Sequence, residues 1–519
     1  MRFAAILALL FSAALRSQTY DLILRGGRVV DGTGSPWYLA DVAIQGDSIA
    51  AIGPLAAASA KRVIDVKGLT IAPGFIDIHT HSRRGIIERP TAENYVRQGV
   101  TTLIEGNDGS SPLPVGAFLD KLKGTSVNFG TFVGQGSIRQ AVIGLDNRKA
   151  TSDEIGKMKE LARQAMREGA LGMSTGLFYV PGNFTPTEEV IELAKVVGSI
   201  GGIHISHMRD EAAAVLDSVR EIIRIGEDGG LPTQVTHHKI IGSPNWGRSV
   251  DTLRLIDEAR ARGVDVSLDQ YPYTASSTGT AALLPQWSQA GGHKQLVARL
   301  HDPATRSRIK AFVVENIKVN RGGGDPRNVF MANCSWDHSL DGKHLAQITD
   351  ERGRTPSVEN AAETALEIQE RGGCAAVYHS MGEEDLERIL LYSSTMIGSD
   401  GEIPEFGKGA PHPRSYGTFA RVLGRYVRER RTLTLQDAIR RMTALPSARM
   451  RLLDRGTLRP GMRADIAVFD AATVADKATF PKPHQYAEGF RHVIVNGTPV
   501  LLDGKMTSER PGRVLRSRQ

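Results

Sequence analysis

Apolar and polar positions alternate with two different periods through most of the chain, and this alternation predicts the fold. Helical stretches carry apolar residues at spacings of three and four, as amphipathic helices do, in residues 153–168, 187–199, 210–226 and 250–263. Between the helical stretches lie short apolar runs, which predict strands at 75–78, 101–106, 129–134, 171–175, 202–207, 233–237, 265–270 and 395–399. Repeated strand–helix units favour parallel strands, and eight of them suit a closed (β/α)8 barrel.

Two further apolar runs, 329–331 and 375–378, also have strand character. We assign the region from about 276 to 373 to an insertion that follows the seventh strand of the barrel. The barrel with its insertion is therefore expected over 73–445.

Both ends of the chain have a β-rich pattern instead. Short runs separated by Gly-rich turns fill residues 20–72, and the same pattern returns at 465–469, 492–497 and 499–504. Two β segments that flank a long middle can pack together. We expect the fold class to be α/β, with a TIM-like (β/α)8 barrel and a small β-sandwich built from 18–72 and 446–519.

The first seventeen residues differ in kind from the rest. Arg2 precedes a thirteen-residue apolar run, Phe3 to Leu15, which is too short to span a bilayer comfortably and fits the apolar core of a secretory signal. We predict a signal peptide over 1–17, with Ser17 as a possible cleavage point, and export to the periplasm or beyond; a buried N-terminal helix is the alternative.

Cys334 and Cys374 allow one disulfide at most, and the sequence leaves open whether it forms.

Composition narrows the functional classes. The chain has 519 residues, 41% of them apolar and 23% charged, as globular proteins do. The net charge of +7 is spread along the chain, with local excess at 425–431 and 510–518 that we interpret as solvated surface. No nucleic-acid module and no further membrane span accompany it. We expect neither a nucleic-acid partner nor a stable membrane anchor, while the oligomeric state stays open.

Polar residues gather where the predicted strands end. A barrel carries its catalytic groups at the carboxyl ends of its strands, and imidazoles with carboxylates suit a zinc site that keeps a position open for water. Asp400 could both touch such a metal and take a proton from its water. His237 and His238 are neighbours on one strand, so only one of them should face the barrel axis. The residues at these ends are His79, His81, Glu105, Asp108, His207, His237, His238, Lys239, Asp269, Tyr271 and Asp400.

Several motifs give these residues a more specific context. The sequence contains PGFIDIHTH at 73–81, HMRDE at 207–211, HHK at 237–239, DQYPY at 269–273, IGSDG at 397–401 and HPR at 412–414. With these motifs the chain resembles the amidohydrolase superfamily and, within it, the D-aminoacylase (N-acyl-D-amino-acid deacylase) family. The resemblance runs from about Tyr20 to Val514 and is weakest in the insertion.

The resemblance implies a role for each matching residue. It implies that His79, His81 and Asp400 form a weaker metal site, that His207 and His237 belong to a tighter one, and that Asp400 is also the general base and acid. The implied cofactor is Zn²⁺, as one or two ions. The resemblance further implies that the substrate carboxylate is held by Lys239, Tyr271 and Arg414, a set whose two cations and one phenol suit an α-carboxylate.

One turn departs from the family pattern. The family usually has a cysteine as the third ligand of the tighter site, in a Gly-Asn-Cys-Gly turn, whereas this chain has Asp108 in the turn 106–109. A carboxylate can bridge two metals as a thiolate can, but it is a harder ligand, so the identity of the metal is open. Glu105 is a competing candidate, and we favour Asp108 because of its position.

The function that the resemblance implies is metal-dependent hydrolysis of the amide bond in N-acyl-D-amino acids, which releases a carboxylate and a D-amino acid. One alternative is a dipeptidase that cleaves peptides with a C-terminal D-residue, because the same carboxylate clamp would serve it. The other alternative is a non-catalytic barrel scaffold, which the presence of all four histidines and Asp400 disfavours.

Overall fold

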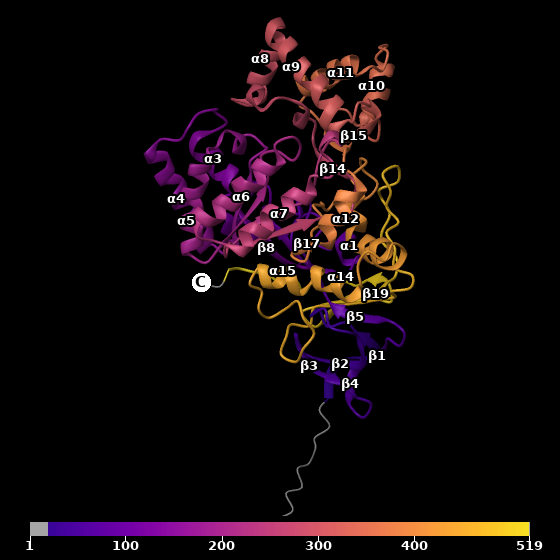
Figure 1. Cartoon of the computed structure of the whole chain (residues 1–519). Coiled ribbons are helices and arrows are strands. Elements are labelled where there is room, and N and C mark those ends of the chain that lie inside the picture. The colour runs from indigo at the N-terminus through magenta and orange to yellow at the C-terminus, as the bar shows by residue number, and fades with distance from the viewer. Residues whose placement is uncertain (1–18, 518–519) are drawn as a thin grey trace, which may run out of the picture.

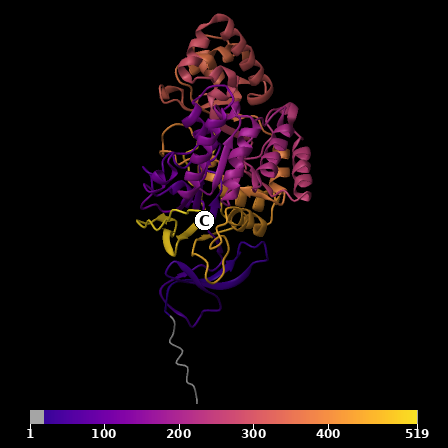
Figure 2. The same ribbon diagram turned by 90° about the vertical axis from the view of Figure 1, so that its left-hand side faces the viewer.

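The structure is a computed structural model that describes residues 19–517. The predicted signal peptide, 1–17, lies outside the described residues. Within the described part, no helix is long and apolar enough to cross a bilayer. The molecule is elongated, with a strand-rich end, a middle of parallel strands and helices, and a mostly helical body at the other end (Figures 1 and 2).

Parallel strands form the middle of the molecule, at the predicted positions. One sheet has the order β6-β7-β8 and the other the order β17-β13-β12-β11-β10-β9. The two sheets are connected at both ends. Only Phe132 separates β8 from β9 along the chain. The segments that follow β6 and β17 are joined by backbone hydrogen bonds from Asp400 N to His79 O (2.8 Å) and from His81 N to Gly401 O (2.7 Å). The bounds are β6 Phe75–Asp77, β7 Val100–Glu105, β8 Asn128–Thr131, β9 Val133–Gly134, β10 Gly172–Gly176, β11 Ile203–His207, β12 Thr233–Val235, β13 Val266–Gln270 and β17 Thr395–Ile397.

Helices connect these strands and pack beside one another along the outside (Figure 1). α6 begins later than residue 210, where the sequence pattern placed it, because the Asp210 carboxylate accepts the N–H groups of Ala212 (2.7 Å) and Ala214 (2.9 Å) and holds a turn there. The bounds are α1 Glu93–Val96, α2 Val115–Leu119, α3 Gln135–Ile143, α4 Ser152–Arg167, α5 Thr187–Ser199, α6 Val215–Gly229, α7 Ser249–Ala261, α12 Glu383–Leu391, α13 Arg414–Arg421, α14 Leu435–Met442 and α15 Ala444–Arg449.

The segment between β13 and β17 forms a body with its own apolar core, seen at the top of Figure 1. The two extra β runs noted in the sequence belong here, in an antiparallel sheet of order β14-β16-β15. A disulfide joins Cys334, just after β15, to Cys374, just before β16. The bounds are β14 Ala275–Gly279, β15 Val329–Asn333, β16 Ala375–His379, α8 His293–His301, α9 Pro303–Asn316, α10 Leu345–Glu351 and α11 Val358–Glu370.

Strands from both ends of the chain share one nine-stranded sheet, of order β21-β20-β19-β18-β5-β1-β2-β3 with β4 beside β1. The junction is the antiparallel pair of β5 and β18, where Ala72 lies opposite Ala467. Gly26 and Gly27 form one of the Gly-rich interruptions noted within 20–72, yet a single strand, β1, runs through them, with a bulge between Leu24 and Gly27. The bounds are β1 Thr19–Val29, β2 Tyr38–Gln45, β3 Ser48–Gly53, β4 Ser59–Asp65, β5 Thr70–Pro73, β18 Ile466–Phe469, β19 Phe490–Val495, β20 Thr498–Leu502 and β21 Lys505–Met506.

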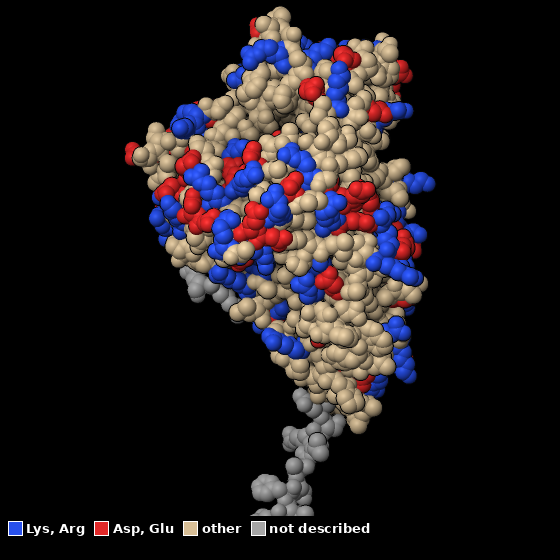
Figure 3. Space-filling view, viewed as in Figure 1, with Lys and Arg blue, Asp and Glu red and all other residues tan. Residues whose placement is uncertain are grey.

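The chain after β21 runs back along the parallel strands. Val514 pairs with Phe129 of β8, while Arg513 and Arg516 stay exposed and bind Asp47 (2.8 Å) and Asp120 (2.7 Å). On the face shown in Figure 3, basic and acidic side chains are likewise intermixed over the helices of the middle region. The positive net charge is therefore not gathered into one patch on this face.

Candidate metal centre and active site

The two histidines of the HTH motif lie just beyond β6, which ends at Asp77. The Asp77 carboxylate accepts the N–H groups of His79 (3.2 Å) and Ser399 (2.9 Å) and so holds the chain at this point. Burial raises the pKa of Asp77 to about 7. His79 and His81 therefore approach the same centre from a held loop rather than from the strand itself, with their ring centroids 5.7 Å apart.

Asp108 sits at the centre of the histidines because of the turn that carries it. Its φ is +55°, in the left-handed region, and Gly106 and Gly109 on either side also have positive φ. A Cβ on Gly109 would lie 2.5 Å from the backbone nitrogen of Gly176, so only glycine fits this close approach. The turn thus points the Asp108 carboxylate at the ends of several strands at once.

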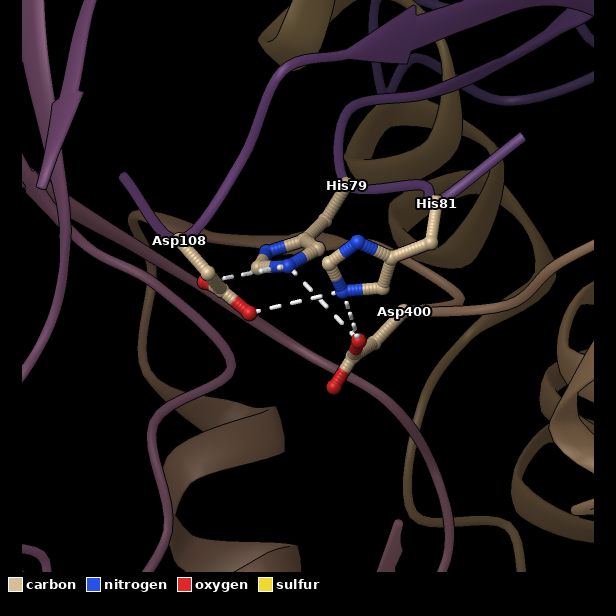
Figure 4. A group of neighbouring side chains, drawn as sticks. All are labelled: His79, His81, Asp108 and Asp400. Carbon is tan, nitrogen blue, oxygen red and sulfur yellow. Dashed lines mark ion pairs between the residues drawn. The ribbon is translucent and has the colours of Figure 1, made fainter. Parts of the chain in front are cut away.

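One carboxylate faces four imidazoles. Asp108 Oδ1 lies 3.5 Å from His79 Nε2 and 3.4 Å from His237 Nε2. Its Oδ2 lies 3.4 Å from His81 Nε2 and 3.8 Å from His207 Nδ1. Figure 4 shows Asp108 and Asp400 on opposite sides of the His79–His81 pair. Two groups able to hold a metal share Asp108: His79, His81, Asp108 and Asp400 in one, and Asp108, His207 and His237 in the other.

Asp269, at the end of β13, orients two of these histidines. Its Oδ1 accepts the backbone N–H of His237 (2.8 Å) and lies 3.4 Å from His79 Nδ1. His237 has a φ of +36°, and its side chain faces the cluster. His238 points away, with its Nε2 2.8 Å from Thr252 Oγ1 on α7.

Glu211 and Lys239 form a second layer behind His207 and His237. Glu211 Oε1 lies 3.3 Å from His237 Nδ1, and Oε2 lies 3.7 Å from His207 Nε2. Lys239 Nζ donates to Glu211 Oε1 (2.5 Å) and to the carbonyl oxygen of His237 (2.9 Å), and it lies 2.7 Å from His237 Nδ1. Burial opposes ionisation of Glu211, but Lys239 and His207 outweigh it and hold its pKa well below the usual value. The sequence motif contained Glu211 without assigning it a role.

Asp400 links the metal group to Arg414. Its Oδ1 lies 3.0 Å from His81 Nε2, and its Oδ2 accepts a hydrogen bond from Arg414 Nη1 (2.7 Å). Burial raises the pKa of Asp400, yet Arg414 and His79 more than reverse that effect, so the pKa lies below its usual value. The ring of Tyr271 lies between the two cations, 4.8 Å from the Arg414 guanidinium and 5.7 Å from Lys239 Nζ.

Glu105, the competing carboxylate, points away from the histidines. It is fully buried and accepts hydrogen bonds from the backbone N–H of Arg83 (2.9 Å) and from Arg83 Nη1 (2.8 Å). Among the described residues it belongs to neither metal-capable group. The structure therefore places Asp108, and not Glu105, beside the four imidazoles.

A cavity of about 540 Å³ opens onto this centre. His81, Asp108, Asp400 and Arg414 line it, whereas Lys239 and Tyr271 lie outside its lining. Sequence reasoning missed Tyr179, which also lines it. The Tyr179 ring lies 4.6 Å from the ring of His207, and its hydroxyl accepts a hydrogen bond from Thr278 Oγ1 (3.2 Å). Its place in the loop after β10 was the available signal, because functional groups sit beyond strand ends in such folds.

Comparison with known proteins agrees with this geometry. The model of the family described as "Amidohydrolase family" matches residues 62–336 and 391–501. The chain belongs to the amidohydrolase family. A D-aminoacylase of Alcaligenes xylosoxydans xylosoxydans is 38% identical to it, over 96% of this chain and 98% of that protein. An N-acyl-D-glutamate deacylase of the same organism is 36% identical, over 96% of each chain.

Solved structures of this family share the mixed α/β fold. The N-acyl-D-glutamate deacylase of Bordetella bronchiseptica, complexed with zinc and a phosphonate inhibitor, superimposes with a TM-score of 0.82 at 34% identity. The match covers 96% of this chain and all of that one. The match thus shows the mixed α/β amidohydrolase fold over 96% of this chain.

Proposed function

We propose that this amidohydrolase hydrolyses the amide bond of N-acyl-D-amino acids, releasing a carboxylate and a D-amino acid. The observation that carries the proposal is the centre itself, in which one carboxylate, Asp108, faces four imidazoles and a second, Asp400, lies beside a cavity. The relatives that share 36–38% of their residues with this chain are a D-aminoacylase and an N-acyl-D-glutamate deacylase. Both names describe hydrolysis of N-acyl-D-amino acids.

The residues at the centre fit a zinc site. Buried side-chain atoms of His79, His207 and Asp108 lack a hydrogen-bond partner among the described residues, and such atoms are normally paired. Imidazole nitrogens and carboxylate oxygens are ligands that zinc accepts. His79, His81 and Asp400 would hold one ion, His207 and His237 another, and Asp108 would contribute to both. A related structure contains zinc, and we propose Zn²⁺, as one or two ions, for this chain.

Asp400 is placed to move the proton that amide hydrolysis requires. Bound zinc supplies a charge that polarises the amide carbonyl and makes water more acidic. Asp400 takes a proton from the attacking water and returns it to the departing amine nitrogen. Its pKa, which Arg414 and His79 hold below the usual value, keeps it ionised near neutral pH. Asp269 and Glu211 hold His79, His207 and His237 in orientation, because a ligand's second nitrogen normally faces such a partner.

We propose that Arg414 binds the substrate carboxylate, and that Tyr271 and Lys239 support it from outside the cavity lining. Arg414 is the member that lines the cavity, and its planar guanidinium suits a carboxylate. The Tyr271 ring lies 4.8 Å from that guanidinium, and Lys239 Nζ lies 5.7 Å from the same ring. A substrate carboxylate on Arg414 competes with Asp400 for the same guanidinium, so binding at this point loosens the Arg414–Asp400 contact.

A paired substrate panel tests the function. N-acetyl-D-amino acids should be hydrolysed far faster than their L-enantiomers, and C-terminally amidated D-substrates should lose most of the rate. Loss of a charged partner in a site built for it costs roughly 2–5 kcal/mol. Equal turnover of D- and L-substrates would refute the assigned stereochemistry, and equal turnover of acid and amide would refute the clamp.

We also propose how the chain divides into domains. The two parallel sheets and the backbone bonds between 79–81 and 400–401 support a closed (β/α)8 barrel over 73–445, with the insertion at about 276–373. Strand β3, at one end of the sheet formed by both chain termini, also bonds to the segment before β18, from Ile49 N to Met462 O (2.8 Å). That return of one edge supports a small β-sandwich made of 18–72 and 446–519.

Export remains a proposal as well. It rests on the apolar run from Phe3 to Leu15 and on the disulfide between Cys334 and Cys374, because disulfides persist in oxidising compartments. The mature protein should begin near Gln18. N-terminal sequencing of the protein from its native host decides this, and an intact Met1 would contradict it.

A further inference from the structure

The outer wall of the cavity determines what the variable parts of a substrate can contact. Small apolar residues and uncharged polar residues form much of this wall. The basic side chains in the described lining, apart from histidines, are only four: Arg83, Arg84, Lys408 and Arg414. Arg414 already pairs with Asp400, which leaves three cations to examine. The uncharged lining residues include Ser137, Gln140, Val180, Pro181, Thr278 and Asn333.

Arg83 is committed to the protein interior. Its Nη1 lies 2.8 Å from Oε1 of Glu105, and Glu105 is fully buried. It also donates to the carbonyl oxygen of Ser110 and, through Nη2, to the Ser110 hydroxyl (2.9 Å). Removing Arg83 from this pair would leave a buried carboxylate unpaired, so Arg83 is not available to a ligand.

The other two cations stand at the rim, each with an acidic partner that also lines the cavity. Arg84 Nη1 lies 2.8 Å from Oε1 of Glu402, and Lys408 Nζ lies 2.8 Å from Oε1 of Glu405. The backbone of Glu402 is fixed, because its carbonyl oxygen accepts from the buried Asn94 side chain (3.0 Å) and its N–H donates to the Ser415 hydroxyl (3.1 Å). The rim therefore carries as many carboxylates as cations.

This pairing has a consequence for the substrate. An acidic side chain that enters the cavity leaves water without finding an unpaired cation, and it approaches the carboxylates of Glu402 and Glu405. Removing the charged carboxylate of such a substrate from water without an unpaired cation to meet it is unfavourable. A substrate whose side chain ends in an amide of the same shape carries no charge and avoids this penalty. A site selective for a charged group normally supplies a dedicated opposite charge.

We propose that Glu402 and Glu405 determine specificity by neutralising Arg84 and Lys408. As a result, the enzyme takes N-acyl-D-amino acids with uncharged side chains and rejects the N-acyl derivatives of D-glutamate and D-aspartate. The proposal rests on the proposed function and adds the substrate class to it. It also predicts that the substrate preference of this chain differs from the one named for its relative, the N-acyl-D-glutamate deacylase that is 36% identical. Glu402 and Glu405 would cause that difference.

Isosteric substrates test the proposal, because the side chains of glutamine and glutamate have nearly the same shape and only that of glutamate is charged. The wild-type kcat/KM for N-acetyl-D-glutamine should exceed that for N-acetyl-D-glutamate by at least about tenfold. In the double variant Glu402→Gln, Glu405→Gln, the freed Arg84 and Lys408 should lower this ratio several-fold, through KM for the acidic substrate. The shift should shrink at high salt, since the side chains of the two pairs are 63% and 42% exposed (Arg84, Glu402) and 71% and 52% exposed (Lys408, Glu405).

A matched control separates the local charge from the net charge. Glu351 and Glu359 pair with Lys343 (2.7 Å) and Lys318 (2.9 Å), and neither acid lines the cavity. The double variant Glu351→Gln, Glu359→Gln changes the net charge equally and should leave the substrate ratio unchanged. If the wild-type enzyme hydrolyses N-acetyl-D-glutamate as well as N-acetyl-D-glutamine, this proposal is overturned while the proposed function stands. An equal shift of the substrate ratio in both double variants would have the same meaning. If neither substrate is hydrolysed, the proposed function itself is rejected, and this proposal with it.

Discussion

Three residues at the centre hold an unusual backbone conformation. Asp108, His237 and Asp400 have φ values of +55°, +36° and +53°, a region that non-glycine residues rarely adopt. Such positions cluster at functional sites, where surrounding contacts hold them against their preference. Each of the three follows a parallel strand and turns its side chain toward the same point. The geometry of the site is therefore built into the backbone, and it limits which substitutions leave the site intact.

Replacement of Asp400 by asparagine tests its role in proton transfer. Asn keeps the size and one oxygen of the side chain but cannot accept the proton from water. We expect turnover to fall by at least about 100-fold, the low end for a positioned acid–base group. Metal bound through His207 and His237 should remain, as measured by elemental analysis of the purified variant. Near-normal turnover would show that another group carries the proton.

Asp108 is the residue whose replacement should change the metal itself. Asp108→Ala removes the carboxylate that faces all four histidines, so metal content and activity should fall together. Asp108→Cys should hold zinc at least as well as wild type and tolerate manganese less, because a thiolate is a softer ligand. Metal content measured after growth or dialysis with each ion checks both expectations.

Glu105→Ala serves as the control for Asp108. Glu105 binds Arg83 and belongs to neither metal-capable group, so its loss should leave metal content near normal. Loss of metal from the Glu105 variant, with retention in Asp108→Ala, would reverse our choice of carboxylate.

The sequence predicted the residues of this centre better than their contacts. The histidines and Asp108 could be found because strand ends and motif spacing place them. The contacts of Lys239 with Glu211 and His237 could not, since they depend on how the loops after β11 and β12 approach each other. Tyr179 is a similar case, because aromatic residues beyond strand ends have many other uses, and Asp269 was found at a strand end without its contacts to His79 and His237.

At the scale of single elements, helix α4 shows how local chemistry sets a boundary. Thr151 caps the helix with its side chain, and the Glu154 carboxylate accepts a hydrogen bond from the Thr151 backbone N–H (2.8 Å). This reciprocal arrangement is a capping box. The helix begins at Ser152, one residue from the position that the sequence pattern predicted. α6 lacks such a cap, and its beginning was missed by five residues because Asp210 forms a turn instead.

The pKa of Glu154 makes this cap sensitive to acid. Hydrogen bonds from Arg148 and from Thr151 lower the pKa of Glu154 from 4.5 to about 2. A pKa lowered by folding adds stability above the unfolded-state value, and that stability is lost as the pH falls toward the folded-state value. Glu154→Gln should therefore melt at a lower temperature than wild type at neutral pH, and the gap should narrow from about pH 4.5 to about pH 2.

Thermal melts followed by circular dichroism over this range measure the gap. In an Arg148→Gln background, the largest cause of the shift is absent, so Glu154→Gln should show a much weaker dependence on pH. A gap that stays constant as the pH falls would contradict the assigned cause.

At the scale of the whole molecule, a buried polar network ties the shared sheet to the parallel strands. Asp465 accepts hydrogen bonds from the Asn128 side chain of β8 (3.0 Å) and from the Asn496 backbone (2.7 Å), and it forms an ion pair with Arg455. Periodicity predicted both β regions but not this link, because pairing across such distances in sequence leaves no local pattern.

Asp465→Asn should destabilise the protein by roughly 3–5 kcal/mol, because Arg455 is left buried without its charge partner. Chemical denaturation measures the change in the free energy of unfolding. Asp217→Asn provides the control: it breaks an exposed pair with Arg220 and should change stability by less than about 0.5 kcal/mol. A loss no larger than the control's would show that the network is not needed for stability.

The sheet that joins both ends of the chain also governs the order in which the protein can be completed. β5 lies inside that sheet, between β1 and β18. At roughly 5–20 residues per second, β18 leaves the ribosome about 20–80 s after β5. Until then, the emerging chain presents β5 as an open edge, and open edges recruit other strands. Newly made chains are therefore most prone to associate wrongly before Ile466 appears, because a strand made late in synthesis covers the edge of a strand made early.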